Sequence, residues 1–506
     1  MAFAAAPTLF VSAGLLAAER SACAAGAPSN EWPLYGRDLS NTRHQDQGAI
    51  DPSTAPQLAP AWSFSSKGAG GRGDFTGTPV VAGGCVYVAS NQGWAFAINA
   101  ETGVTVWAVD LPGTGVVNSS MDVAGKRVFA FVSKVGAPYV VALDRINGEV
   151  LWRTVVDRQA GADAFSSPVA YDGLVFVGVS GDAAQHADES QRNQFHGSFV
   201  LLDERDGSII AKTWTIPERD WKEGFAGATV TAVPAIDERK RYAYVGTGSS
   251  FRPQKEHANA NAILKIDLDR RRPSFGEIID SYKGDTFDDF LPGFRDLPCY
   301  DLPIPPPPPI VPTGRGIGAC GDIDLDFAAS PNLFRLAGGR LVIGSSQKSG
   351  GYHLVDGTSM KRVWRASWGM PQPFGGVSTA FDGEAIYGGA APPGYLFSLE
   401  PDDGSLRWAA PVGDGAHYGH PVASSKGVVF TVDLKGFLDA YDAATGAVLL
   451  HRPIALGADT GADPTLSFGG VSIARDTVYV AVGIQNSGLD PTGDLNGYVV
   501  AFRSAP

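Results

Sequence analysis

A short pattern recurs along the chain and limits its fold more strongly than any other feature. Each copy contains an apolar strand, a short turn, a second apolar strand, an acidic or asparagine residue and a glycine turn. The acidic or asparagine position is filled in turn by Asn99, Asp144, Asp203, Asp267, Asp356, Glu400 and Asp442. The closest of these anchors are 42 to 45 residues apart, a spacing typical of a four-stranded propeller blade.

A tryptophan follows the acidic position by eight residues in most copies: Trp107, Trp152, Trp364 and Trp408. Phe275 and Leu450 are read as occupying that position in two other copies. The tryptophan offers a large apolar face that can pack between blades, and the acidic side chain can accept N–H groups of the turn. β-Branched and aromatic runs separated by glycine turns indicate antiparallel hairpins.

The last copy, YVVAFRSAP, ends the chain before an outer strand appears. The segment APAWSF near the N-terminus, which contains Trp62, is predicted to supply that strand. Pairing of the first and last strands would close the ring and remove its open edges. The chain is therefore predicted to be an all-β, eight-bladed propeller, with seven blades as the alternative if the fourth unit is misread.

Charge and composition narrow the possible partners. The net charge is −13, which argues against nucleic acid as a partner. The 63 glycines and 35 prolines are typical of a chain that turns often.

The N-terminus has the pattern of an export signal. Residues Phe3 to Ala18 are apolar and small residues continue to Ala27, so residues 1–27 are predicted to be a secretory signal peptide cleaved near Ala25 or Ala27. A disordered tail is the alternative. The apolar run is short for a membrane span, so no span is expected in the mature chain. Residues 28–506 would then form one propeller in the periplasm or outside the cell.

The four cysteines are Cys23, Cys85, Cys299 and Cys320. Cys85 lies in the strand-like run CVYVAS and is expected to be buried and inert. Cys299 and Cys320 bracket one long loop, and export would favour a disulfide between them. No CxxC pair is present, so neither a structural zinc site nor covalently attached haem is indicated.

Several longer phrases carry a family resemblance. WPLYGRDLSNTR (Trp32 to Arg43), followed by LAPAWSF, is similar to the opening of the quinoprotein alcohol dehydrogenase propellers. DIDLDFAASPNLF (Asp322 to Phe334), followed by SSQKSGGYHLVD, resembles the polyvinyl alcohol dehydrogenase-like branch, as do VGVSGD and FHGSFVLLDERDG. The resemblance covers Trp32 to Phe502.

This resemblance implies an activity and two cofactors. Pyrroloquinoline quinone (PQQ) would lie in the central channel together with a Ca²⁺ ion, which would polarise a quinone carbonyl. A carboxylate would remove the proton of an alcohol hydroxyl while hydride passes to the quinone. The substrate would be a small or polymeric alcohol, and a separate carrier such as cytochrome c would accept the electrons.

The resemblance also assigns residues to the quinone. Lys348 of QKSG falls where the family places a cation against the quinone oxygens, and a solvated lysine on a turn is the alternative. Further cofactor positions fall on Thr76, Ser119, Ser180, His196 and Thr231. Three of these depart from the family, which usually has Glu at the position of Thr76, Arg at His196 and Trp at Thr231. The family's vicinal cysteine pair is also absent, and its candidate regions here are residues 118–120, around Ser119, and residues 194–197.

The metal and catalytic positions are altered as well. Ser249 stands where the family has an asparagine ligand, and Asp182 is the carboxylate nearest the expected glutamate ligand. The catalytic carboxylate maps to Glu256 or to Asn261, depending on the gap placed. Asp326, in a run with Asp322 and Asp324, could compensate, and a solvated turn is the alternative.

Residues 286–321 form an insertion containing DLPIPPPPPIVP, a polyproline-type stretch. It is read either as a lid or partner-docking loop or as a surface loop ordered by its disulfide. Two competing functions remain beside the alcohol dehydrogenase. One is a propeller that has lost its quinone and serves as a scaffold, and the other is a quinone-independent enzyme using residues such as His417 and His420.

Overall fold

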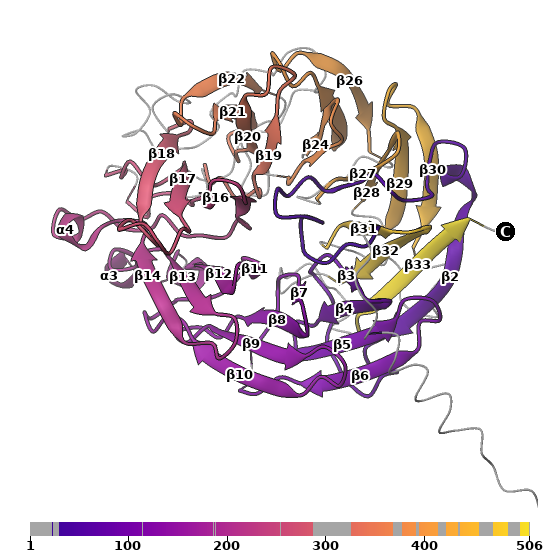
Figure 1. Cartoon of the computed structure of the whole chain (residues 1–506), viewed down its shortest axis with the longest axis horizontal. Helices are drawn as coiled ribbons and strands as arrows, with labels where there is room; N and C mark the ends of the chain where they lie inside the picture. Colours follow the sequence, from indigo (N-terminus) through magenta and orange to yellow (C-terminus); the bar gives the residue numbers. More distant parts are fainter. Residues whose placement is uncertain are drawn as a thin grey trace, which may run out of the picture.

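Eight antiparallel sheets surround a common axis in the computed structural model of the chain (Figure 1). The structure describes residue 23 and residues 30–113, 115–185, 187, 189–252, 255–286, 325–367, 377–390, 394–412, 421–433, 436–454, 469–483 and 496–504. Eight blades are therefore confirmed, and the seven-blade alternative is wrong. The fourth unit forms a complete sheet of its own.

Within each blade the strands follow one another from the axis outward (Figure 1). Blades 1 to 4 comprise β3 (Val80–Ala82), β4 (Cys85–Ala89), β5 (Trp94–Asn99), β6 (Thr105–Asp110); β7 (Asp122–Ala124), β8 (Arg127–Val132), β9 (Tyr139–Asp144), β10 (Val150–Val155); β11 (Val169–Tyr171), β12 (Leu174–Val179), β13 (Ser198–Asp203), β14 (Ile209–Trp214); and β15 (Ala235–Asp237), β16 (Tyr242–Gly246), β17 (Ala262–Asp267), β18 (Ile278–Lys283).

Blades 5 to 8 continue the same order. They comprise β19 (Asn332–Arg335), β20 (Leu341–Ser346), β21 (Gly351–Asp356), β22 (Arg362–Ser367); β23 (Ala380–Phe381), β24 (Ile386–Ala390), β25 (Tyr395–Leu399), β26 (Leu406–Pro411); β27 (Ala423–Ser425), β28 (Val428–Val432), β29 (Phe437–Asp442), β30 (Val448–Pro453); and β31 (Val471–Ala474), β32 (Thr477–Val482), β33 (Tyr498–Ser504).

In the part of the chain that the structure describes, the few helices are single turns outside the sheets. They are η1 (Ala55–Gln57), α2 (Asp182–Gln185), α3 (Glu189–Arg192) and α4 (Glu218–Trp221). Among the described residues no helix has the length and apolar character needed to cross a membrane.

The two ends of the chain close the ring. Strand β2 (Leu58–Ser65) forms the outer strand of blade 8 by pairing antiparallel with β33, so that Ser63 faces Val500 and Ser65 faces Tyr498. This confirms the prediction made from APAWSF. A further short strand, β1 (His44–Gln45), pairs in parallel with β27 of blade 7. The N-terminal segment therefore contacts both of the last two blades.

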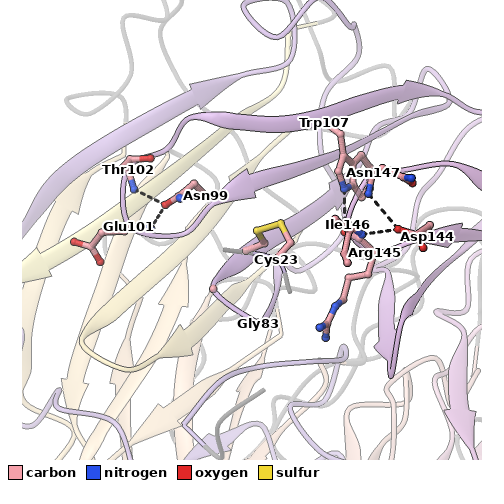
Figure 2. Close-up of a disulfide and its surroundings, with 12 residues drawn as sticks. Cys23, Gly83, Asn99, Glu101, Thr102, Trp107, Asp144, Arg145, Ile146 and Asn147 are labelled. Atoms are coloured by element: carbon pink, nitrogen blue, oxygen red, sulfur yellow. Dashed lines mark hydrogen bonds between the residues drawn. A yellow bond between two sulfur atoms is a disulfide. The ribbon is translucent and has the colours of Figure 1, made fainter. Parts of the chain in front are cut away.

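Five tryptophans each link one blade to the next. The indole Nε1 of Trp107, on the outer strand of blade 1, donates to the carbonyl of Arg145 in a turn of blade 2 at 3.1 Å (Figure 2). Trp62, Trp152, Trp364 and Trp408 make the corresponding bonds to Ala100, Glu204, Pro401 and Ala443. Each of these indoles also covers a turn glycine of the following blade, and a Cβ on Gly148 would lie 2.9 Å from the Trp107 ring. Glycine is therefore required beneath the indole.

The junction between blades 4 and 5 is made by different residues. Strand pairing places Asp280, not Phe275, at the tryptophan position opposite Lys265, so the assignment of Phe275 is wrong. The turn of this blade is longer than in the others and carries Phe275 before β18 begins. Lys265 replaces the indole as the donor, because its Nζ reaches the carbonyls of Gly357 and Thr358 in blade 5.

The acidic and asparagine residues stabilise these turns as predicted. Asn99 Oδ1 accepts the N–H groups of Glu101 and Thr102 (Figure 2). Asp144 Oδ1 accepts those of Ile146 and Asn147 in the same way. The side chain thereby fixes the turn on which the preceding tryptophan docks.

A disulfide joins Cys23 to Cys85 of β4 (Figure 2). The expectation that Cys85 is buried is confirmed, but the expectation of an inert thiol is wrong, because Cys23 packs against it inside the core. Cys299 and Cys320 lie outside the described residues. Cleavage near Ala25 or Ala27 would remove one half of this disulfide, so that cleavage and the disulfide cannot both exist in one mature chain.

Loss of the disulfide should destabilise the fold measurably. The bridge closes a loop with a sequence separation of 62 residues. Cys85→Ser should therefore lower the free energy of unfolding by about 2–4 kcal/mol, mainly through greater freedom of the unfolded chain. Urea denaturation of the full chain with and without reductant measures this, and Cys23→Ser should lose the same amount. A stability that neither variant changes would contradict the pairing.

A buried carboxyl group should give the fold a pH dependence. Burial raises the pKa of Asp122 to about 7, although hydrogen bonds from the Ala170 and Val123 amides work in the opposite direction. In the unfolded chain an aspartate has a pKa of about 3.9. The folded state therefore holds a proton that the unfolded state releases, and this contribution to stability is lost as pH rises from about 4 through about 7.

Asp122→Asn should accordingly flatten the pH dependence of unfolding. We expect the wild type to lose on the order of 2 kcal/mol more than the variant between about pH 5 and pH 8, measured by urea denaturation at each pH. Asp144→Asn is the matched control, because asparagine already fills that turn position in blade 1. Parallel pH profiles for wild type and Asp122→Asn would contradict the raised pKa.

Candidate functional site

Asp326 and Lys348 form the centre of a polar network between blades 4 and 5. The Lys348 Nζ lies 3.3 Å from Asp326 Oδ2, and the Lys348 backbone N–H donates to the Asp326 carbonyl at 3.0 Å. Asp326 lies on the segment that leads into β19, and Lys348 lies in the turn after β20. The two side chains are only 10% and 15% exposed, so their attraction is weakly screened by water.

Ser249 and Asn261 extend the network into blade 4. The Ser249 backbone N–H donates to Asp326 Oδ1, and the Ser249 hydroxyl donates to Asn261 Oδ1 at 2.9 Å. Asn261 has a φ of 49°, a left-handed conformation that asparagine tolerates better than most residues. The Asn261 amide in turn donates to Glu256 Oε1 at 2.6 Å.

The predicted catalytic residues thus lie together. Lys348, Asp326, Asn261 and Glu256 are joined through Ser249, one of the two predicted metal ligands. Their roles remain predictions, but the sequence separated them into three segments that the propeller brings into one cluster. Such a cluster offers a carboxylate that can accept a proton beside a fixed positive charge.

Lys283, at the end of β18, is a member of this cluster that sequence reasoning missed. Its Nζ lies 2.9 Å from Glu256 Oε1 and also donates to the carbonyls of His257 and Ala260. It therefore neutralises Glu256 and fixes the loop that carries Asn261. A lysine ending the strand IIDSYK gave no signal, because its partners come from a loop more than twenty residues upstream.

A cavity of about 240 Å³ lies where residues from around the ring meet, and none of the network residues is among those that line it. Its walls come from residues that precede the inner strands of seven blades, together with Tyr35 from the N-terminal segment. The lining residues are Tyr35, Thr76, Gly77, Thr78, Asn118, Ser119, Ser120, Phe165, Ser167, Thr231, Val233, Ala328, Ser330, Pro421 and Gly469. Three predicted cofactor residues, Thr76, Ser119 and Thr231, are among them.

Several polar atoms on the cavity wall have no protein hydrogen-bond partner. These are Thr76 Oγ1, Asn118 Oδ1, Ser119 Oγ and Ser120 Oγ. Thr76, Ser119 and Ser120 are 7%, 4% and 3% exposed, so bulk water does not satisfy them. Unsatisfied buried hydroxyls are costly and are commonly found where a ligand or bound water completes them.

Three predicted residues lie elsewhere. Ser180 pairs through its backbone with Asp163, and Asp182 begins the short helix α2. His196 stacks on Trp221 with 4.1 Å between the ring centroids, and its Nε2 lies 2.9 Å from the Phe225 carbonyl. Burial lowers the pKa of His196, which favours the neutral ring. Its observed contacts support the loop around α4.

Asp163 is a second residue that sequence reasoning missed. Burial raises its pKa to about 6, and its Oδ2 accepts the Ala183 N–H while its Oδ1 has no partner. It lies beside Ser180 and shortly before the cavity-lining Phe165. The only sequence signal for Asp163 was its place in the loop DAFSSP, two residues before Phe165.

One group of metal-binding side chains lies in blade 7. Within the described part of the chain, Asp433, Asp439 and His451 are the residues whose potential ligand atoms lie within 4.8 Å of one another. His451 Nδ1 is 2.6 Å from Asp439 Oδ1, and the ring stacks on Phe437. This group contains none of the predicted site residues.

Comparison with known proteins gives one family match and several relatives. The family model described as outer membrane protein assembly factor BamB matches residues 49–289 and 348–496. A polyvinylalcohol dehydrogenase of a Pseudomonas species is 26% identical over 92% of this chain and 75% of its own length. One from Sphingopyxis sp. (strain 113P3) is 25% identical over 94% of this chain and 76% of its own length.

Among solved structures, the quinohemoprotein alcohol dehydrogenase of Comamonas testosteroni is similar in fold. The TM-score is 0.70 at 19% identity, covering 97% of this chain and 84% of that one.

Removal of a hydroxyl without a hydrogen-bond partner should change stability differently from removal of a partnered hydroxyl on the same cavity wall. Ser167 Oγ accepts the Ser120 backbone N–H at 3.0 Å, whereas Ser120 Oγ has no partner. Ser167→Ala should therefore lower the free energy of unfolding by about 1–3 kcal/mol, because it leaves a buried N–H unpaired. Ser120→Ala should leave stability unchanged or raise it. Urea denaturation checks both, and a larger loss in Ser120→Ala would contradict the assignment.

Proposed function

This chain belongs to the quinoprotein alcohol dehydrogenase family of propellers, and on that premise we propose that it oxidises an alcohol hydroxyl to a carbonyl by hydride transfer to PQQ. The observation that carries the proposal is the little-exposed Lys348–Asp326 pair, which does not line the axial cavity but lies on a chain segment that leads to it. Asp326 precedes the cavity-lining Ala328 by two residues, so the pair and the cavity share one segment of chain.

The residues present fit a bound quinone. PQQ is planar and anionic, and it needs a cation and hydrogen-bonding groups around a flat space. Lys348 supplies the cation, and Thr76, Asn118, Ser119 and Ser120 supply polar atoms that the protein leaves unsatisfied. Thr231 lines the same cavity and would lie against one face of the ring system. When bound, the quinone supplies the electron-pair acceptor that no side chain provides.

Asp326 is the favoured general base. Its carboxylate lies on the cavity segment, and Ser249 and Lys348 fix its two oxygens. It would take the proton of the alcohol hydroxyl as the hydride leaves the adjacent carbon. Glu256, the other carboxylate candidate, accepts from Asn261 and pairs with Lys283. These contacts suit it to hold Asn261, and through it Ser249, in place.

Lys348 has two roles in the proposed reaction. Its ammonium group lies 3.3 Å from Asp326 Oδ2 and holds the carboxylate in place by charge attraction. It would also stabilise negative charge that develops on the quinone oxygens. Both effects depend on the low exposure of the pair, since water would screen them.

The donor chemistry also fits a hard divalent cation. Ser249 Oγ, Asn261 Oδ1 and an Asp326 oxygen are oxygen ligands of the kind that Ca²⁺ prefers. Ser249 was one predicted ligand. The other predicted ligand, Asp182, lies beside Asp163 and outside this network, so the proposed ion would be held without it. A bound ion would act as a Lewis acid toward the quinone carbonyl.

The setting of the reaction is part of the proposal. The Cys23–Cys85 disulfide supports an oxidising compartment, and the proposed location is the periplasm or the outside of the cell. With Cys23 retained in the chain, the eight blades would act as one propeller. The substrate is a small or polymeric alcohol, and a separate carrier such as cytochrome c would remove the electrons.

Quinone binding by the purified protein is the direct test. Absorbance titration with PQQ in the presence of Ca²⁺ should show saturable binding, and added alcohol should then reduce an artificial electron acceptor. Lys348→Ala should weaken PQQ binding by about 10- to 100-fold, the value of a lost charge-assisted hydrogen bond. Lys361→Ala is the control, because Lys361 is an exposed lysine of the same blade.

Failure of the wild type to bind PQQ would overturn the proposal. That result would favour a propeller that acts as a scaffold or a quinone-independent enzyme. Equal affinities of wild type and Lys348→Ala would instead remove Lys348 from the site.

A further inference from the structure

A buried ion pair joins blades 4 and 5 next to the turn that carries Lys348. Arg365 of β22 reaches Asp285, which follows β18, with its Nε 2.8 Å from Oδ1 and its Nη2 2.6 Å from Oδ2. The side chain of Asp285 is 10% exposed and that of Arg365 25%. A two-pronged contact of this kind fixes the orientation of both groups.

The chain is shaped to admit the arginine. A Cβ on Gly351 would lie 2.9 Å from Arg365 Nη2, closer than such atoms normally approach. Glycine at the start of β21 therefore leaves room for the guanidinium to cross that strand. This fit would be lost if a larger residue stood at position 351.

Asp285, held by Arg365, hydrogen-bonds to the residues on both sides of Lys348. Its carboxylate accepts the Ser349 hydroxyl at 2.6 Å, and its backbone N–H donates to Gln347 Oε1 at 2.8 Å. The Gln347 amide donates back to the Asp285 carbonyl at 2.9 Å and to the Leu325 carbonyl at 2.7 Å. One carboxylate and one amide therefore tie the residues on either side of Lys348 to the residue before Asp326.

The same carboxylate also faces a buried histidine. His353 Nε2 lies 3.5 Å from Asp285 Oδ2, and its Nδ1 lies 2.9 Å from the Tyr282 hydroxyl. Burial acts to raise the pKa of Asp285, but hydrogen bonds from His353, Arg365 and Ser349 hold it well below its ordinary value. The carboxylate is thus ionised wherever the protein is folded near neutral pH, and the clamp stays intact.

We propose that Arg365 is a positioning residue that sets the separation of Lys348 and Asp326 through Asp285 and Gln347. This inference rests on the proposed function, because it concerns how the cation and the base are held for the reaction. Arg365 itself contacts neither the cavity nor the pair. It fixes Asp285, which fixes the turn, and Gln347 carries the same constraint to the segment of Asp326.

A displaced Lys348 should affect the reaction more than the binding of alcohol. Arg365→Ala should lower kcat by about 10- to 100-fold while leaving KM for the alcohol within about twofold, because misplacement of a reacting group mainly raises the barrier. PQQ affinity, measured by absorbance titration, should fall by about tenfold, since the cation no longer faces the quinone oxygens.

Chemical rescue separates positioning from general support of the fold. Guanidinium ion added at millimolar concentration should restore part of the kcat and PQQ affinity of Arg365→Ala, because it can occupy the vacated place against Asp285. Arg365→Lys should be intermediate, since an ammonium cannot make the two-pronged contact. Arg340→Ala is the matched control, because Arg340 forms an ion pair with Asp356 in the same blade and is 48% exposed.

The outcomes distinguish this proposal from the function on which it rests. A wild type that binds no PQQ overturns both. A wild type that binds PQQ, with an Arg365→Ala variant that keeps its kcat and affinity, overturns the positioning role alone. If Arg365→Ala unfolds and guanidinium does not restore its activity, the positioning role is also contradicted, unless Ser349→Ala shows the same decline in kcat. Ser349→Ala removes one hydrogen bond from Asp285, and unchanged kinetics there would overturn the proposal.

Discussion

The contact between a tryptophan and the turn of the following blade is the interaction on which the rest of this structure depends. Each indole donates one hydrogen bond to a turn carbonyl and covers a glycine, so its position is fixed in distance and in rotation. Repetition of this contact sets the angle between neighbouring sheets. Three blades lack this tryptophan, and Ala211, Asp280 and Leu450 stand at its position in blades 3, 4 and 7. In blade 4 Lys265 makes hydrogen bonds to the turn of blade 5 instead, so a different donor joins these two blades.

The tryptophan contacts lie at the outer rim of the ring, so the residues at its inner end can have other roles. Some residues before the inner strands hydrogen-bond from blade to blade, as the Ser120 N–H does to Ser167 Oγ, but small polar side chains such as Thr76 and Ser119 are left to line the axis. The reactive pair stands at the junction of blades 4 and 5, and Asp326 precedes the lining residue Ala328 by two positions. This junction lacks a docking tryptophan, as do the junctions that follow blades 3 and 7. Hydrogen bonds from Lys265 and the Arg365–Asp285 ion pair join the two blades there.

Most of the architecture could be predicted from the sequence because its signals are local. The turn residues and tryptophans recur at fixed spacing, and the incomplete last repeat pointed to the strand containing Trp62. Phe275 was misplaced because a longer turn keeps the eight-residue spacing while shifting the strand register. Lys348 and Asp326 were identified by resemblance, but their contact and the part of Lys283 were not. Such contacts join separate loops, and the spacing of residues in the sequence does not indicate them. The partner of Cys85 was missed for the same reason, since Cys23 lies in a segment read as a removable leader.

The pairing of β2 with β33 has a consequence for how the molecule is made. Strand β2 emerges from the ribosome early, but its partner is the last strand of the chain. Until synthesis is complete, β2 is an unpaired edge that can associate with other chains. The first seven blades can assemble in order, whereas the final junction has to wait. Export before closure, or a chaperone that covers this edge, would therefore protect the nascent protein at its most exposed stage.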